Sequence, residues 1–311
     1  MKWIYYVLKL FLGTLVALLL VYLGYRSWQS WCDPISVLMR NTAFPTLLQE
    51  SSYASEDEFE KRIYTDIVLD SRGVGLVNCT VSLPVNIPEE GLPCILLISG
   101  LDTGKKSLNY LNDQRGFAII SYEYPQVIRN IKSYRGLFRL KAIRQNVFNV
   151  PSQLLSVVRW AQTQPWCEKK PISIPGFSFG AIFIPATYHF SQKSGIKLGP
   201  SVIGYGGAGL FDLFYANLPG PIWLKTPLAY LANFLFRPIE PAVHAPFLKN
   251  RFLIINGLYD KLVPFRSAER LQNIIPEPKT VENLETEHMY PENQALINLL
   301  LEKTKNFLIN S

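Results

Sequence analysis

Residues 171–190 read PISIPGFSFGAIFIPATYHF, a short apolar run followed by a Gly-x-Ser-x-Gly pentapeptide and a second apolar run. This order predicts a strand, a sharp turn and a helix. Gly176 and Gly180 flank Ser178, and the turn needs them because a strained backbone leaves no room for a Cβ on residues packed beside the serine. The pattern therefore predicts that Ser178 stands exposed at the end of a strand. A glycine-rich turn with a capping serine is the alternative interpretation.

The chemistry of Ser178 depends on its neighbours. A serine hydroxyl is a poor nucleophile until a base removes its proton. The amide of Phe179 lies at the start of the predicted helix, where the backbone favours negative charge. Ser178 is therefore a candidate nucleophile, and the Phe179 amide is a candidate donor to an oxyanion.

The composition limits the class of protein. With 311 residues, of which 48% are hydrophobic and 18% charged, the chain is too apolar for disorder and long enough for one large α/β domain with appendages. Its net charge of +7 comes with neither an interleaved aromatic and basic motif nor zinc-finger spacing, so we expect no nucleic acid partner. An anionic bilayer is the expected partner of the positive charge. The four cysteines form no CxxC pair, which predicts that the chain binds no metal.

The N-terminal segment predicts a membrane anchor. Residues 3–25 carry no charge except that of Lys9, and a helix of this length covers roughly 35 Å, enough to cross a hydrocarbon core. A cleaved signal peptide is the alternative, but residues 24–32 lack a pair of small residues of the AxA type, and the apolar run exceeds the usual length. We therefore assign residues 1–30 to a single transmembrane helix.

The charges beside this helix predict its orientation. Lys2, Lys9 and the amino terminus precede the apolar core, whereas Arg26 follows it. Because positively charged flanks tend to stay in the cytoplasm, we expect a single-pass membrane protein with a cytoplasmic N-terminus. The folded domain, with any active site in it, is then extracytoplasmic.

Residues 31–60 are expected to be an acidic linker, because they contain acidic side chains with little apolar periodicity. The folded domain then begins near Lys61 and extends over residues 61–311. Turn glycines between β-rich segments predict an opening hairpin at 63–69 and 76–83.

The rest of the chain alternates apolar runs with helical patterns. Buried strands are predicted at 94–99, 117–122, 172–174, 201–205 and 252–256, with a short strand at 279–283. Helices are predicted at 151–164, 179–190 and 265–274, and a last helix with one apolar stripe from Glu292. This alternation predicts an α/β fold with a doubly wound, mostly parallel sheet.

Two stretches depart from this alternation. Residues 126–150 hold six basic side chains and no acid, which indicates either a solvated basic face or a contact with anionic lipid. Residues 206–250 are rich in aromatic residues and proline and fall between two predicted strands, so we expect an inserted cap. Since exposed aromatic clusters are unusual, we expect the cap to cover Ser178 and to line an acyl pocket. The candidate lining residues are Phe211, Phe214, Trp223 and Phe234. A second packed layer or a membrane-facing surface is the alternative.

A serine nucleophile needs a base and an orienting acid, and later loops supply both. Asp260 follows one predicted strand, and His288 follows the next. The two other histidines, His189 and His244, are expected to have structural roles. Ser178, Asp260 and His288 are therefore the candidate catalytic residues.

The order serine, acid, histidine resembles that of the α/β-hydrolase superfamily, and the resemblance covers residues 61–311. Residues 176–180 (GFSFG) are similar to the nucleophile elbow of that family, and residues 256–264 (NGLYDKLVP) are similar to its acid-bearing loop. Glu287 and His288 are similar to its histidine loop. The resemblance therefore implies the α/β-hydrolase fold, with an inserted cap and a preceding transmembrane helix.

A further segment of the same family pattern is found at residues 95–101 (ILLISGL), which are similar to the strand and turn that carry the second oxyanion donor. In this chain that donor is implied to be the Leu101 amide. The pattern is most similar to the dienelactone-hydrolase and prolyl-oligopeptidase-like branches. It departs from the family in having Ser99 where a histidine is common, Ala181 where glycine is frequent, and Pro185 inside the helix after the elbow.

The resemblance implies a serine hydrolase that cleaves a carboxylic ester through an acyl-enzyme, and it implies neither a metal nor a cofactor. Its substrate would be a small-molecule or lipid-like acyl compound. A peptidase, a thioesterase or an acyltransferase would use the same three groups. A membrane-bound interaction module that keeps the fold without the reaction is the alternative from another class.

One motif of a different class is present. Residues 204–209 (GYGGAG) satisfy the GxGxxG pattern that binds dinucleotides after a strand. That pattern needs an acid about 20 residues further on to bind the ribose, and residues 213–239 contain none. We therefore expect no dinucleotide cofactor.

Overall fold

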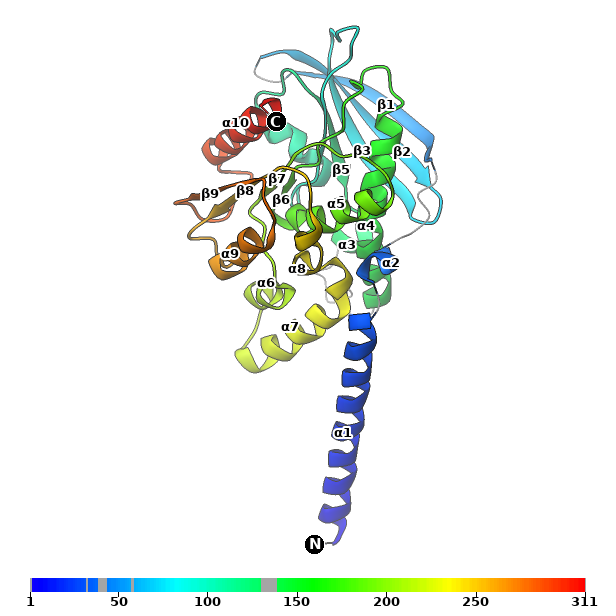
Figure 1. Ribbon diagram of the computed structural model, residues 1–311, viewed down its shortest axis with the longest axis vertical. Coiled ribbons are helices and arrows are strands. Elements are labelled where there is room, and N and C mark those ends of the chain that lie inside the picture. The colour runs from blue at the N-terminus through cyan, green and yellow to red at the C-terminus, as the bar shows by residue number, and fades with distance from the viewer. Residues whose placement is uncertain (1, 32, 39–43, 57–58, 130–138, 311) are drawn as a thin grey trace.

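The computed structural model describes residues 2–31, 33–38, 44–56, 59–129 and 139–310. Its first element is helix α1 (Lys2–Trp31), which projects from the rest of the molecule (Figure 1). Along α1, the stretch Trp3–Trp28 is long and apolar enough to cross a membrane by its length and composition. The predicted N-terminal segment is therefore a helix.

The strands of the described residues form two hydrogen-bonded groups. Their bounds are β1 (Thr46–Glu56), β2 (Lys61–Ser71), β3 (Gly75–Pro84), β4 (Cys94–Leu97), β5 (Ala118–Glu123), β6 (Gly176–Phe177), β7 (Ser201–Gly204), β8 (Phe252–Gly257) and β9 (Lys279–Leu284). The first group has the order β1-β2-β3-β5-β4, in which all neighbours are antiparallel except β4 and β5. The second group has the order β6-β7-β8-β9, and all its neighbours are parallel.

Isolated bridges join the two groups into one mixed sheet. Ile95 of β4 pairs with Ser173, and Ile98 pairs with Gly176, both in the parallel sense. The predicted hairpin is confirmed as β2 and β3. The expected mostly parallel arrangement holds only from β5 to β9, because β1, β2 and β3 add antiparallel pairings on one side.

The linker expected at 31–60 is wrong in its described part, which contains helix α2 (Pro34–Leu38) and strand β1. Ile35 and Leu38 are buried in the main core, and Ser152 donates a 2.9 Å hydrogen bond to the Leu38 carbonyl. The described side chains of β1 are exposed. An edge strand of this kind has no alternation of buried and exposed residues, so the sequence carries no strand signal there.

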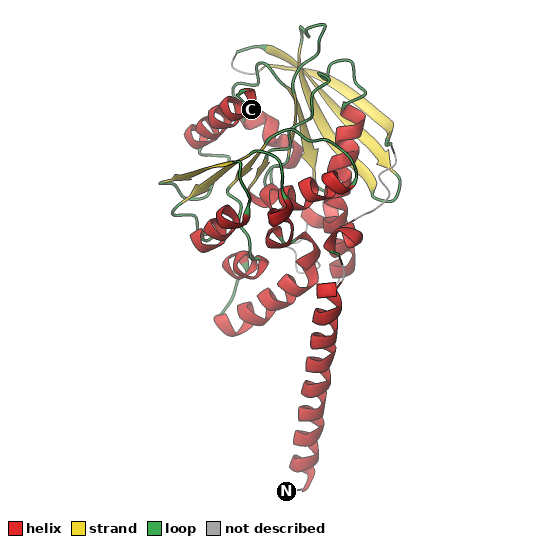
Figure 2. Cartoon of the chain, viewed as in Figure 1, coloured by secondary structure: helices red, strands yellow, loops and turns green. Residues whose placement is uncertain are grey.

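Helices cover both faces of the sheet (Figure 2). Besides α1 and α2, the described helices are α3 (Gln126–Arg129), α4 (Leu140–Ala161), α5 (Phe183–Lys193), α6 (Leu210–Asn217), α7 (Ile222–Phe236), α8 (Pro241–His244), α9 (Phe265–Ile274) and α10 (Gln294–Ile309), with 3₁₀ turns η1 (Gly104–Tyr110), η4 (Ser178–Ile182), η5 (Arg237–Ile239) and η6 (Ala245–Phe247). Leu154 of α4 and Phe183 of α5 belong to the core of one face. Leu296 and Leu300 of α10 belong to the core of the other. The predicted doubly wound arrangement is confirmed.

The insert at 206–250 is helical and contains α6, α7 and α8. In Figure 1, α6 and α7 lie at the end of the domain from which α1 projects. The Phe234 ring of α7 contacts Tyr22 and Tyr25 of α1, at ring-centroid distances of 5.4 and 4.4 Å. The insert therefore packs against the N-terminal helix.

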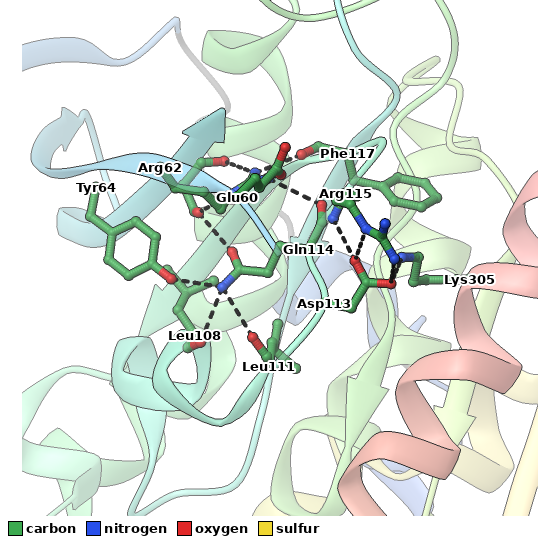
Figure 3. A network of polar contacts seen from close by, with 11 residues as sticks. Glu60, Arg62, Tyr64, Leu108, Leu111, Asp113, Gln114, Arg115, Phe117 and Lys305 are labelled. Atoms are coloured by element: carbon green, nitrogen blue, oxygen red, sulfur yellow. Dashed lines mark hydrogen bonds and ion pairs between the residues drawn. The ribbon is translucent and has the colours of Figure 1, made fainter. Parts of the chain in front are cut away.

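A buried arginine ties the first strands to the loop before β5. Arg62 of β2 is 1% exposed; its Nε donates to the Ser82 hydroxyl at 2.8 Å, and it forms an ion pair with Glu60. Its terminal nitrogens donate to the carbonyls of Gln114, Ser82 and Phe117 at 3.2, 3.0 and 2.8 Å (Figure 3). All three guanidinium nitrogens thus have acceptors, which a buried guanidinium requires.

The same network reaches the last helix. Asp113 accepts a 2.7 Å hydrogen bond from Lys305 of α10 and a 2.9 Å bond from Nε of Arg115 (Figure 3). Gln114 donates to the Tyr64 hydroxyl at 2.7 Å. The loop before β5 is therefore held between β2 and α10.

Candidate active site

The predicted strand, turn and helix around Ser178 are present. β6 ends at Phe177, η4 begins at Ser178, and α5 follows. Ser178 has a φ of 55°, in the left-handed region that residues with a Cβ rarely adopt. The turn presents the partly exposed Ser178 side chain at the carboxyl end of β6.

Close packing explains both flanking glycines. A Cβ on Gly176 would lie 2.7 Å from Cδ1 of Ile184 on α5. A Cβ on Gly180 would lie 2.7 Å from the carbonyl carbon of Ile98 and 2.9 Å from the carbonyl oxygen of Ser99. Gly176 thus lets α5 approach the strand, and Gly180 lets the elbow approach the loop after β4.

The structure brings Ser178, His288 and Asp260 together. Oγ of Ser178 lies 2.7 Å from Nε2 of His288, and Nδ1 of His288 lies 2.7 Å from Oδ2 of Asp260. Asp260 is in the loop after β8, and His288 is in the loop after β9. The His288 and Asp260 side chains are 6% and 1% exposed, so this pair is shielded from water.

The second oxygen of Asp260 is fixed by its own loop. Oδ1 accepts hydrogen bonds from the amides of Leu262 and Val263, at 2.8 and 2.9 Å. Oδ2 therefore faces the imidazole as an acceptor, and Nδ1 of His288 carries the proton between them. In a neutral ring, Nε2 is then free to accept a hydrogen bond from the Ser178 hydroxyl.

Sequence reasoning missed the groups that hold the histidine loop. The Tyr205 ring, directly after β7, contacts the His288 ring edge-on at 5.6 Å, and its hydroxyl lies 2.7 Å from Oγ1 of Thr286. Burial raises the pKa of Tyr205, so its hydroxyl stays protonated. A Cβ on Gly257 would lie 2.6 Å from the Thr286 carbonyl oxygen. The feature of the sequence that could have pointed to this contact is a bulky aromatic residue, Tyr205, between the glycines of residues 204–209.

The candidate oxyanion donors lie on segments that touch. Leu101 is in the loop after β4, and Phe179 is in the elbow, whose second glycine packs on that loop. The Ser99 hydroxyl donates to the Gly104 carbonyl at 2.9 Å, and the Tyr124 hydroxyl donates to the Ser99 carbonyl at 2.7 Å. Ser99, which stands where the α/β-hydrolases often have histidine, therefore helps to fix the loop that carries Leu101.

The four candidate lining residues belong to α6 and α7. Phe211 packs between α6 and α7, Phe214 packs on the end of α7, and Phe234 packs on α1. Trp223 is 76% exposed. Among the ring contacts of the described residues, none joins α6 or α7 to the three catalytic candidates. The expectation that these side chains cover Ser178 stays a prediction, and the ring contacts show an aromatic cluster that packs on itself and on α1.

His189 and His244 pair with each other. Their Nδ1 atoms are 3.1 Å apart, and Nε2 of His244 lies 2.7 Å from the Pro238 carbonyl oxygen. Burial lowers the pKa of His244 to about 4, so this ring stays neutral near pH 7. In the described part of the chain, the pair is not joined by a third His, Cys, Asp or Glu that would make a metal site. A pair that joins α5 to α8 agrees with the expected structural roles.

Comparison with known proteins gives similarity at the level of structure. No protein-family model matches the chain, and no curated protein matches it in sequence. Acetyl xylan esterase 1 from Thermoanaerobacterium sp. JW/SL YS485 is 14% identical, with a TM-score of 0.58 over 86% of this chain and 92% of that chain. Est1E from Butyrivibrio proteoclasticus is 15% identical, with a TM-score of 0.55 over 79% and 99%. The 2,6-dihydroxy-pseudo-oxynicotine hydrolase is 15% identical, with a TM-score of 0.54 over 77% and 67%.

These similarities extend over more than three quarters of the chain. At such low identity they concern the fold, since one fold serves many functions. The mixed sheet, the helices on both of its faces and the elbow after β6 agree with them. The chain has the fold of the α/β-hydrolase superfamily.

Proposed function

We propose that the chain is a membrane-anchored serine hydrolase that cleaves a carboxylic ester through an acyl-enzyme. The observation that carries this proposal is the series of two 2.7 Å contacts from Ser178 through His288 to Asp260. A nucleophile, a base within its reach and an acid that orients the base are the groups that acyl transfer needs. A purely structural module would have no need for Ser178 in a strained turn beside a histidine.

In the first step, Nε2 of His288 takes the proton of Ser178 while Oγ bonds to the carbonyl carbon of the ester. Asp260 holds the Nδ1 proton in place and stabilises the imidazolium that forms. His288 then gives its proton to the leaving alcohol as the bond between the carbonyl carbon and the alcohol oxygen breaks. The acyl group remains on Ser178.

In the second step, His288 removes a proton from water, and the hydroxide adds to the acyl carbon. The Ser178 oxygen then leaves with the proton from His288. The acid is released and the enzyme is regenerated. An alcohol in place of water would give acyl transfer with the same groups.

Both steps pass through a tetrahedral oxyanion. The amides of Phe179 and Leu101 are the proposed donors to it, because the elbow and the loop after β4 lie against each other beside Ser178. Donors fixed before the reaction stabilise developing charge without reorganisation, and loss of one donor lowers kcat on the order of 100-fold or more.

The similar structures favour an ester as substrate. Two of them are named as esterases, and the third is named as a hydrolase. A small-molecule or lipid-like ester is therefore proposed ahead of a peptide or a thioester. No nucleic acid partner is proposed.

Helix α1 is the proposed membrane anchor, with the catalytic domain outside the cytoplasm. Its apolar stretch Trp3–Trp28 is exposed along its length, and such a surface is stable in a bilayer. Alkaline carbonate should leave the chain in the membrane fraction, and detergent should release it. Release by carbonate alone would contradict a spanning helix, and a mature N-terminus beyond Tyr25 would support a cleaved signal.

The proposed reaction is tested with the full chain in detergent and a fluorophosphonate probe, which labels activated serine hydroxyls. We expect labelling of the wild type and of the control Ser51→Ala on β1, and none of Ser178→Ala. Equal Tm values would show that all three are folded. Hydrolysis of p-nitrophenyl esters from acetyl to octanoyl then gives the preferred acyl length. Near-normal turnover by folded Ser178→Ala would refute the assignment.

A further inference from the structure

Helix α7 exposes apolar side chains along one surface. The α7 face consists of Ile222, Trp223, Leu224, Tyr230 and Leu231, which are 71%, 76%, 39%, 57% and 48% exposed. Trp223 and Tyr230 are seven residues apart, and Leu231 follows directly, so they share one side of the helix. An exposed apolar patch of this kind marks a contact with a protein or a membrane.

The opposite side of α7 is apolar as well. Ala229 and Phe236 are buried against the domain. Lys225 is the only charged residue of the helix, and its ammonium lies 4.7 Å from the centroid of the Tyr215 ring. The helix is mostly apolar around its circumference, and such a helix is typical of a core or a membrane. Because the domain covers one side only, the α7 face needs a second apolar environment.

The α7 face is continuous with α1. Phe234, which contacts Tyr22 and Tyr25 of α1, follows Tyr230 and Leu231 by one helical turn and lies on their side of α7. From this contact, α1 continues away from the domain through exposed apolar residues. Figure 1 shows α7 at the same end of the domain. A bilayer that surrounds α1 up to the two tyrosines would therefore reach the α7 face.

The charges near this contact suit anionic headgroups. Residues 213–239 contain no acidic side chain. Arg144 of α4 donates from Nε to the Leu235 carbonyl at 2.9 Å, which places the start of α4 beside the end of α7. Arg139 and Lys141 at that start are exposed. Basic residues beside an apolar helix face are what an anionic bilayer surface attracts.

We infer that the α7 face lies in the bilayer surface beside α1, with its side chains at the boundary between headgroups and acyl chains. The occupant of the face is lipid. Trp223 and Tyr230 are residues that gather at this boundary, because each combines an apolar ring with one polar group. The inference rests on the proposed anchoring by α1 and is independent of the proposed reaction. A second contact with the bilayer fixes the tilt of the domain, which a single helix would leave free.

The test uses the full chain in vesicles of phosphatidylcholine and phosphatidylglycerol. Trp223→Cys and Leu231→Cys place a fluorophore on the α7 face, in a Cys32→Ser background. Leu15→Cys in α1 is the control for the bilayer interior. Leu299→Cys on α10, which is 38% exposed, is the control for water.

The three remaining cysteines do not interfere, because they are buried: Cys79, Cys94 and Cys167. At each labelled position, quenching by aqueous iodide is compared with quenching by two lipids, one with a nitroxide near the headgroup and one with a nitroxide deep in the acyl chain, which is the quencher for the probe at 15. We expect lipid nitroxides to quench probes at 223 and 231 several times more strongly than the probe at 299. Iodide should quench the probe at 299 more strongly than the probes at 223 and 231.

Three results would overturn the inference. Iodide access at 223 and 231 equal to that at 299, with the probe at 15 quenched by lipid, would show that the face is in water. Protection from both quenchers, with crosslinking between copies at 223, would show that a second copy covers it. Absence of lipid quenching at 15 would remove the anchor and the inference with it. Ester turnover of the same vesicles reports the reaction separately, so a loss of turnover with unchanged quenching leaves the α7 inference standing.

Discussion

Replacing Gly180 by alanine should lower turnover by moving the oxyanion donors. The added Cβ would lie 2.7 Å from the Ile98 carbonyl carbon and 2.9 Å from the Ser99 carbonyl oxygen. Because carbon atoms in contact lie about 3.5 Å apart, the elbow and the loop after β4 would have to separate by roughly 0.8 Å. The clash is with backbone atoms, which cannot rotate away as a side chain can. The two segments carry Phe179 and Leu101, so their separation widens the proposed oxyanion site.

The size of the effect follows from this displacement. A misplacement of about 1 Å lowers enzymatic rates on the order of 100-fold. We expect kcat of Gly180→Ala to fall by about 10- to 100-fold, or roughly 1.4 to 2.7 kcal/mol in activation free energy. Hydrolysis of p-nitrophenyl butyrate by the detergent-solubilised full chain measures kcat, and the rate of fluorophosphonate labelling measures Ser178 directly.

Gly199→Ala is the matched control. Its Cβ would lie 2.6 Å from Oγ of Ser173 and 2.8 Å from the Pro171 carbonyl oxygen. This clash also involves a backbone oxygen, together with a side-chain hydroxyl, and it lies before β7 and away from the carboxyl ends of the strands. We expect a lower Tm with kcat unchanged. The reasoning would be refuted if folded Gly180→Ala kept its kcat or lost no more than Gly199→Ala.

Three further predictions address the acid, a buried cation and pH. Asp260→Asn should lower kcat by several orders of magnitude, because the new amide nitrogen donates to Nδ1 of His288 and forces the ring proton to Nε2. Its Tm should be nearly unchanged, because Oδ1 can still accept hydrogen bonds from the two loop amides. A near-normal kcat would contradict this prediction. Arg62→Met should lower the free energy of unfolding by about 3 kcal/mol, because it leaves buried carbonyl oxygens without hydrogen-bond donors. In the same denaturant titrations, substitution of the exposed Arg72 by Met should change the free energy of unfolding by less than about 0.5 kcal/mol. Burial lowers the pKa of His244 from 6.5 to about 4. Between about pH 4 and 6.5 the imidazole therefore binds a proton in the unfolded chain but not in the folded chain. Tm should then fall as the pH drops from about 6.5 to about 4. His244→Gln should flatten that fall, and equal pH dependence in both proteins would sink the argument.

The catalytic candidates could be predicted from the sequence because each follows a strand that carries a local signal. Every residue of β8 is buried and residues 252–255 form a continuous apolar run, and Asp260 lies just after the strand. The glycines around Ser178 mark a turn that other residues would not allow. Functional side chains of open α/β sheets gather at these carboxyl ends, so order along the chain was enough to group them.

Other features have no local signal. Strand β1 exposes its described side chains and gives no alternation, so it could not be told from a linker. For α7, the composition indicates that its apolar residues need a cover, but a pocket, a core and a membrane select the same residue types. The contact of Tyr205 with His288 joins distant parts of the chain, and only the folded sheet brings them together.

The distorted start of strand β1 has a consequence for contacts between copies of the protein. β1 is at the edge of the sheet, and a long exposed edge is a template for pairing with another chain. Its register with β2 shifts between Leu47 and Gln49, and such an irregularity twists an edge away from a partner. Glu50 follows, and a neighbouring copy that paired at this edge would bring a second negative charge close to it. The proposed anchoring by α1 would raise the effective concentration of these edges in the plane of a membrane. The irregular start of β1 and its glutamate are therefore features that disfavour pairing of the sheet edges of neighbouring copies.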